Sequence, residues 1–154
     1  MKKLLKLLII LIFFFSGEQI LAQGVLDFGK NFYTVKKMAD NKFGNTCDGS
    51  GKVLIYCVSD GSKISLMFRD NQFSDLQFWN PYSSKRIAEL ELEKQINEFS
   101  KEQNMTPYYS GGFATFTTAE MAVGVSFSIV EFKKTSYVRK IYQYEPLLSY
   151  PISQ

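Results

Sequence analysis

Histidine is absent from the 154 residues of this sequence. Catalysis of the Ser-His-Asp and Cys-His types depends on an imidazole as general base, so both mechanisms are excluded. Metal sites built on imidazole ligands are excluded for the same reason. Among the common hydrolytic mechanisms, those based on a pair of carboxylates remain.

Cysteine is nearly absent, since the sequence contains only Cys47 and Cys57, ten positions apart. The spacing is not the Cys-x-x-Cys of redox and zinc motifs, and no histidine could complete a zinc site. Residues 48–51 form a turn signal, and the strand expected after it carries Cys57. We therefore predict a disulfide in an oxidising compartment, with redox or metal chemistry of the two thiols as the alternative.

The glycines form no phosphate-binding loop. No Gly-x-Gly-x-x-Gly occurs, and residues 48–51 are not followed by the Gly-Lys-Ser/Thr and helix of a P-loop. Asp-Gly-Ser occurs at Asp48 and Asp60, but neither copy continues into a calcium loop with its closing glutamate. Both copies are interpreted as turns, and the sequence predicts no cofactor and no metal site.

Long apolar runs are limited to residues 7–15, which follow Lys2, Lys3 and Lys6. A cationic start before a short apolar run is typical of a secretory signal peptide, here of a bacterial exporter, and Ala22 is a small residue suited to cleavage. An uncleaved anchor is the alternative, but it would need about 20 apolar residues. We predict cleavage after Ala22 and export to the periplasm or beyond the cell, without a membrane-spanning segment in the mature chain.

The mature chain also lacks an excess of charge of either sign. Removal of residues 1–22 leaves 15 Lys and Arg against 14 Asp and Glu. The remaining basic clusters are isolated pairs, whereas nucleic-acid binding needs clustered cations. No nucleic-acid partner is predicted.

Two helices are expected. Residues 25–40 keep apolar side chains at helical spacing, with Asp27 as the cap and residues 41–44 as the exit. Ser83 or Ser84 caps a longer helix that reaches about Gln103. Its apolar stripe consists of Ile87, Ala88, Leu92, Ile96 and Phe99.

Six strands are expected, at residues 52–59, 62–69, 72–79, 112–118, 121–132 and 136–144. Pro81 ends the first group of three, and Asp60-Gly61 and Asp70-Asn71 form its turns. Alternation in residues 62–69 and 121–132 places an apolar face against a polar one. Pro146 and Pro151 indicate an extended C-terminal tail at residues 146–154.

The fold class predicted is α+β, in the order α-βββ-α-βββ. Residues 23–145 form one domain, in which both helices pack on one face of an antiparallel sheet of about six strands. This architecture resembles that of the β-lactamase inhibitor proteins, which are exported tandems of helix-plus-sheet units with a disulfide near the first helix. The resemblance is one of fold and shares no sequence motif, so the activity does not transfer.

Half-exposed aromatic side chains are the most prominent feature that remains. Trp79 and Tyr82 precede the long helix, and Tyr108 and Tyr109 follow it in an expected loop. Interfaces are enriched in Trp and Tyr, so these four residues are the candidate binding surface. The alternative is strand packing, because tyrosine is also a good strand former.

The sequence thus predicts an exported, non-catalytic binding domain, and its role could be inhibitor-like. Its predicted partner is a protein, a peptide or an envelope component. No catalytic residue is predicted, because the acids lie mainly on the long helix and in turns. The alternative is a hydrolase of cell-wall or extracellular glycan, whose two acids must face one cleft about 5 to 10 Å apart. A structural role in an envelope assembly is a third possibility, recognisable by an exposed sheet face or an uncharged edge strand.

Overall fold

The computed structural model describes residues 28–117 and 122–144, and its elements are two helices and eight strands. The predicted signal peptide, residues 1–22, and the predicted tail, residues 146–154, lie outside the described residues. The elements are α2 (Phe32–Phe43), β1 (Asp48–Ser50), β2 (Val53–Cys57), β3 (Lys63–Arg69), β4 (Gln72–Tyr82), α3 (Lys85–Gln103), β5 (Tyr108–Ser110), β6 (Phe113–Phe116), β7 (Val123–Phe132) and β8 (Thr135–Tyr144).

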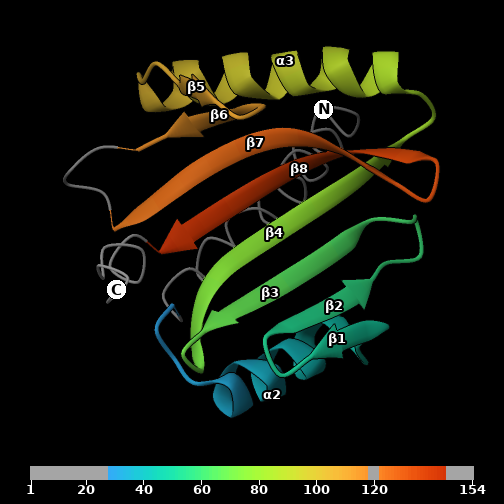
Figure 1. Ribbon diagram of the computed structural model, residues 1–154, viewed down its shortest axis with the longest axis vertical. Coiled ribbons are helices and arrows are strands. Elements are labelled where there is room, and N and C mark those ends of the chain that lie inside the picture. The colour runs from blue at the N-terminus through green and yellow to red at the C-terminus, as the bar shows by residue number, and fades with distance from the viewer. Residues whose placement is uncertain (1–27, 118–121, 145–154) are drawn as a thin grey trace, which may run out of the picture.

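The strands form one antiparallel sheet in the order β1-β2-β3-β4-β8-β7-β6-β5. Each half of the chain is a helix followed by four consecutive strands, and the halves join where β4 pairs with β8 (Figure 1). The α+β class with two helices and one antiparallel sheet is confirmed. The predicted number and order of strands are wrong, because the order is α-ββββ-α-ββββ.

The two missing strands are β1 and β5, which lie at the edges and have three residues each. β1 is part of what the sequence indicated as a turn, and Gly49 explains why it pairs. A Cβ on Gly49 would lie 2.6 Å from the carbonyl oxygen of Val53, so only glycine allows this approach to β2. β5 contains Tyr108 and Tyr109, which were expected in a loop and pair instead with β6.

The first helix begins later than the sequence predicts. Its cap is Asn31, whose Oδ1 accepts a hydrogen bond from the Thr34 amide at 3.0 Å. Phe28 keeps the helical spacing but stacks on Phe73 at 4.7 Å, and the Gly29 amide donates to the Phe73 carbonyl. Residues 28–30 therefore lie alongside the first residues of β4 and are not part of the helix.

A side-chain pair links α2 to the sheet. The Tyr56 hydroxyl donates to Asp40 Oδ1 at 2.8 Å, and Lys36 Nζ donates to the other oxygen of that carboxylate. Hydrogen bonds from Lys36 first, and then from Tyr56, lower the pKa of Asp40. Burial, followed by the hydrogen bond to Asp40, raises the pKa of Tyr56. Tyr56 is 1% exposed, so its hydroxyl depends on this acceptor.

Replacing Tyr56 by phenylalanine is expected to lower the free energy of unfolding by about 1 kcal/mol at neutral pH. Because the folded state raises the pKa of Tyr56, the stability that this group supplies is present below about pH 10 and is lost as pH rises further. The Tyr56→Phe variant should therefore lose less stability than the wild type between pH 9 and 11. Denaturant unfolding at several pH values measures this difference, and parallel curves for the two proteins would contradict it.

The second helix, α3, confirms the prediction closely. Ser84 Oγ accepts from the Ile87 amide at 3.3 Å, and Asn104 ends the helix in the left-handed conformation. Ala88 and Ile96 are buried against the sheet, whereas Ile87 is 46% exposed and does not belong to the core. Neither α2 nor α3 has the length and hydropathy that crossing a bilayer requires.

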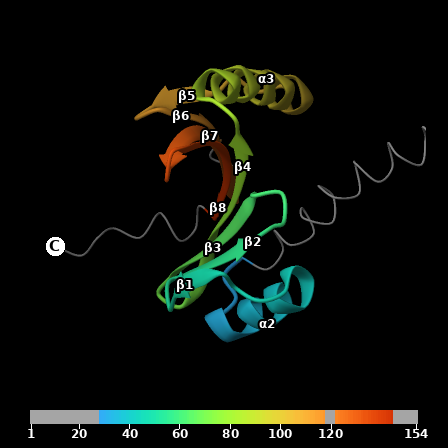
Figure 2. The same ribbon diagram turned by 90° about the vertical axis from the view of Figure 1, so that its right-hand side faces the viewer.

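Both helices pack on the same face of the sheet, as predicted, and each covers its own core (Figure 2). Val35 and Ala39 of α2 pack with apolar side chains of β2, β3 and β4. Ile96 of α3 packs with apolar side chains of β6 and β7, with Phe99 at their margin. Tyr142 of the central strand β8 contacts both cores.

Pro81 does not end β4, contrary to the prediction. It lies within the strand and faces Tyr137 of β8. The pairing of β4 with β3 stops at Trp79, so Pro81 is beyond the reach of β3. Proline is tolerated where one neighbouring strand has ended, because its missing N–H then removes no ladder bond on that side.

The predicted disulfide between Cys47 and Cys57 is present, with a Cα–Cα distance of 5.8 Å. Cys47 precedes β1 and Cys57 ends β2, so the bond closes the hairpin at one edge of the sheet. The Cys47 amide also donates to the Ile55 carbonyl at 2.9 Å. The bond thus holds a strand of only three residues to its neighbour.

Candidate binding surface

One face of the sheet carries no helix of the described residues. Figure 2 shows the edge strands bending away from the two helices, so this face is the concave one. We call it the open face. Small polar side chains on it, Ser65, Ser126 and Ser128, are nonetheless buried, because they lie between larger neighbours along and across the strands.

A row of directly paired residues crosses the centre of the open face. Lys63 of β3 pairs with Trp79 of β4, Trp79 pairs with Arg139 of β8, and Arg139 pairs with Ser128 of β7. Neighbouring strands are about 4.8 Å apart, so the backbone positions of Lys63 and Arg139 are roughly 10 Å from each other, with that of Trp79 between them. We call Lys63, Trp79 and Arg139 the central row.

The Arg139 guanidinium lies against two aromatic rings. Its Cζ is 5.3 Å from the centre of the Trp79 ring and 5.4 Å from that of Phe113, and its Nε donates to Ser128 Oγ at 3.2 Å. Burial lowers the pKa of Arg139, although arginine stays charged at any physiological pH. The site therefore holds a partly desolvated positive charge.

The Lys63 ammonium is also placed over aromatic rings. Its Nζ is 4.3 Å from the ring centre of Phe132 and 5.4 Å from that of Tyr137. Contacts of this kind contribute about 0.5 to 2 kcal/mol and hold the cation in position without neutralising it. Both cations of the central row are thus positioned by aromatic groups.

Asp75 of β4 is a buried acid of the open face, and its carboxylate is already hydrogen-bonded. Asp75 accepts hydrogen bonds from Ser74 Oγ at 2.6 Å and from Gln143 Nε2 at 3.0 Å. It is four residues from Trp79 along β4, or about 13 Å. The Asp75 carboxylate therefore accepts hydrogen bonds from polar groups at the other end of the strand and does not neutralise the cations of the central row.

The structure separates the four aromatic residues of the candidate surface. Trp79 is half-buried at the centre of the open face, and Tyr108 is on the same face but four strands away, or about 19 Å. Tyr82 and Tyr109 are on the helix-bearing face. Burial, followed by the charge of Glu91 on α3, raises the pKa of Tyr82, which places its ring against that helix.

The chain matches no protein-family model, no curated protein and no solved structure. The site must therefore be interpreted from its own geometry. In residues 28–117 and 122–144, no three His, Cys, Asp or Glu side chains gather as metal ligands would.

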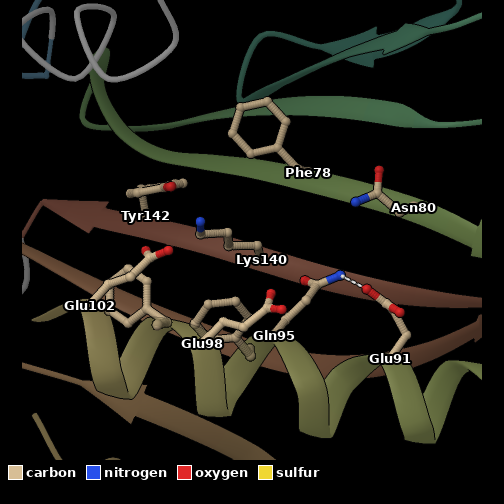
Figure 3. Close-up of a pocket in the computed structure, with 10 residues that line it drawn as sticks. Phe78, Asn80, Glu91, Gln95, Glu98, Glu102, Lys140 and Tyr142 are labelled. Carbon is tan, nitrogen blue, oxygen red and sulfur yellow. Dashed lines mark hydrogen bonds between the residues drawn. The ribbon is translucent and has the colours of Figure 1, made fainter. Parts of the chain in front are cut away.

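A cleft of about 350 Å³ lies on the other face, between α3 and the central strands (Figure 3). Carboxylates of α3 stand on one side of it, and Lys140 of β8 lies on the other. The lining residues are Phe78, Asn80, Glu91, Gln95, Glu98, Phe99, Glu102, Phe127, Lys140 and Tyr142.

The charges in this cleft are mostly exposed to solvent or held by neighbours. Glu98 and Glu102 are exposed, and Glu91 accepts a hydrogen bond from Gln95 Nε2 at 3.4 Å. The Lys140 ammonium lies 5.3 Å from the ring centres of both Phe99 and Tyr142. The pKa is lowered for two carboxyl groups, those of Asp40 and Asp60, and neither of them lines the cleft.

Sequence reasoning missed Lys63, Phe113 and Arg139 as parts of a site. The alternation in β3 had already placed Lys63 on the polar side, and the same alternation in β8 separates Arg139 from Val138. That signal shows which face a residue occupies, but it does not show which residues of other strands stand beside it. The pairing of β4 with β8 supplies that information.

Proposed function

We propose that this protein is a small exported binding domain that holds a protein or peptide partner on the open face of its sheet. The observation that carries the proposal is the central row, in which aromatic and cationic side chains are gathered on a face without a covering helix. Trp, Tyr and Arg are the residues that most often dominate binding energy at interfaces. The open face brings all three together at its centre.

The dimensions of the open face support a macromolecular partner. The five strands β3, β4, β8, β7 and β6 have about eight residues each on average, which gives a surface of roughly 24 Å by 27 Å, or about 650 Å². Stable protein interfaces bury about 800 Å² on each partner, so one face of this sheet is nearly sufficient. A concave face of this size favours a convex protein segment over a small molecule.

Export is part of the same proposal. The disulfide between Cys47 and Cys57 supports it, because such bonds persist mainly in oxidising compartments. A partner in the periplasm, on the envelope or outside the cell follows from that location.

The proposal is tested with a photo-cross-linking amino acid in the protein produced by its native host. Tyr108 is 70% exposed on the side of the open face, and Tyr33 is 79% exposed on α2, so p-benzoylphenylalanine at each position gives a matched pair. Irradiation should yield a covalent adduct of discrete mass from position 108, at least tenfold stronger than from position 33. Equal adducts from both positions, or none from position 108, would reject the open face as the binding surface.

The cleft of Figure 3 favours one alternative, a carboxylate-dependent hydrolase of cell-wall or extracellular glycan. Glu91, Glu98 and Glu102 line the same cleft, as a pair of glycosidase acids must. Release of sugar from a glycan that stops in a Glu98→Gln variant would establish this alternative. The binding function remains our conclusion, because the central row has no role in such a reaction.

A further inference from the structure

We infer that the central row, Lys63, Trp79 and Arg139, is a subsite for a carboxylate side chain of the partner protein. This inference rests on the proposed function and specifies the chemistry of the partner at the centre of the open face. Three observations carry it: two cations without an acidic partner, an indole N–H without an acceptor, and aromatic surroundings.

The first observation is the missing countercharge. Within the described residues, neither Lys63 nor Arg139 has a carboxylate oxygen within 4.0 Å, although three other ion pairs form there. Arg139 is half-buried and has five N–H donors, of which Nε alone has an acceptor in these residues. A partly buried charge is costly unless it is paired, so an incoming anion would relieve this cost.

The second observation is the Trp79 indole. Its Nε1 is buried and has no hydrogen-bond partner in the described part of the chain. An unpaired buried donor costs about 1 to 3 kcal/mol, and most such groups in native proteins are paired. Trp79 pairs in the sheet with both cationic residues, so the side chains of the central row offer donors and no acceptor.

A carboxylate complements this set better than other groups. It accepts hydrogen bonds only, carries the opposite charge and can take two parallel N–H bonds from a guanidinium. The carboxylate reaches the buried indole N–H when the side chains around it move, and side-chain changes of this kind are common on binding. Two cations are too few to hold a nucleic-acid backbone.

The aromatic surroundings favour a carboxylate on a protein. Phe132 is 42% exposed beside Lys63, and Phe113 and Tyr137 are half-buried or buried around the row. A free inorganic anion would leave these rings in water, whereas an Asp or Glu on a protein surface brings apolar neighbours that cover them. Exclusion of water then strengthens the central ion pair.

The chain contains one tryptophan, so its indole N–H is a reporter for this site alone. We expect N-acetyl-glutamate amide, added to the mature, disulfide-bonded protein, to shift the Trp79 indole resonance in a saturable way. N-acetyl-glutamine amide has the same shape without the charge and should shift it at least tenfold less. Equal shifts from the two amides, or a shift as large from inorganic phosphate, would overturn the inference.

The matched variants are Arg139→Gln and Lys140→Gln. They remove the same charge from adjacent residues of β8 that face opposite sides of the sheet. Arg139→Gln should weaken the glutamate response at least tenfold, and Lys140→Gln should leave it unchanged, with thermal unfolding showing that both variants are folded. An equal response in both variants would overturn the inference.

The same variants separate this inference from the proposed function. If the adduct from position 108 persists in the Arg139→Gln variant while the indole does not respond to glutamate, the open face binds a partner without this subsite. If position 108 gives no adduct, the proposed function itself fails.

Discussion

Replacing Phe127 by alanine is expected to lower the free energy of unfolding by about 3 to 5 kcal/mol. Phe127 is 1% exposed at the centre of the core under α3. Its ring lies 5.5 Å from that of Phe99 and 6.0 Å from that of Phe116, both edge to face. The opposing residue on β6 is Ala114, whose methyl group is too small to fill the space that the ring leaves.

A loss of this size would be a large part of the 5 to 15 kcal/mol that stabilise an ordinary domain. The measurement is the midpoint of urea unfolding, followed by circular dichroism. Phe132→Ala is the control, because this residue is on the same strand but 42% exposed and should cost below about 1 kcal/mol. Similar losses in the two variants would show that the core under α3 is not packed as described.

Removing the disulfide by replacing Cys47 and Cys57 with alanine is expected to cost about 2 to 3 kcal/mol, or roughly 10 °C in melting temperature. The bond closes a loop of ten positions, and the unfolded chain without it gains conformational freedom. The gain matters at this place because β1 has only three residues and the sheet supports it on one side only.

Hydrogen exchange of the oxidised and reduced protein locates the effect. We expect the amide of Cys47, which donates to Ile55, to lose protection on reduction, while the central strands β4 and β8 keep theirs. Alkylation should add no label before reduction and two labels after it, which shows that both thiols were bonded. An unchanged melting temperature in the double variant would mean that pairing alone holds the edge hairpin.

The long elements could be predicted because each contains its own signal. α3 combines a serine cap with a stripe of apolar residues that extends over more than three turns, and only the position of Ile87 was wrong. β7 alternates over ten residues, so Val125 and Phe127 were correctly assigned to the face opposite Ser126. Periodic patterns of this length identify the type of element with few alternatives.

The short and irregular elements could not be predicted. Three residues give no period, and β1 has the composition of a turn because Gly49 permits a close approach to β2. Phe28 fits the spacing of a helix, yet its contact with Phe73 keeps it outside α2. Pro81 breaks strands in most contexts, but here β3 has already ended beside it.

The candidate surface shows the same limit. Trp79 was predicted as a binding residue from its type alone, and its neighbours Lys63 and Arg139 were not, because they are 16 and 60 positions away in the chain. Their proximity depends on the register of β3, β4 and β8, which no local pattern encodes. Conversely, Tyr82 and Tyr109 are close to other candidates in the sequence but are on the opposite face.

The two edges of the sheet have a consequence for self-association. β1 and β5 are three residues long, so another chain could add only about three backbone pairs at either side. Long, flat edges are the template from which sheets grow into aggregates, and neither β1 nor β5 presents one. The two outermost strands therefore offer little backbone on which a second copy of the chain could extend the sheet.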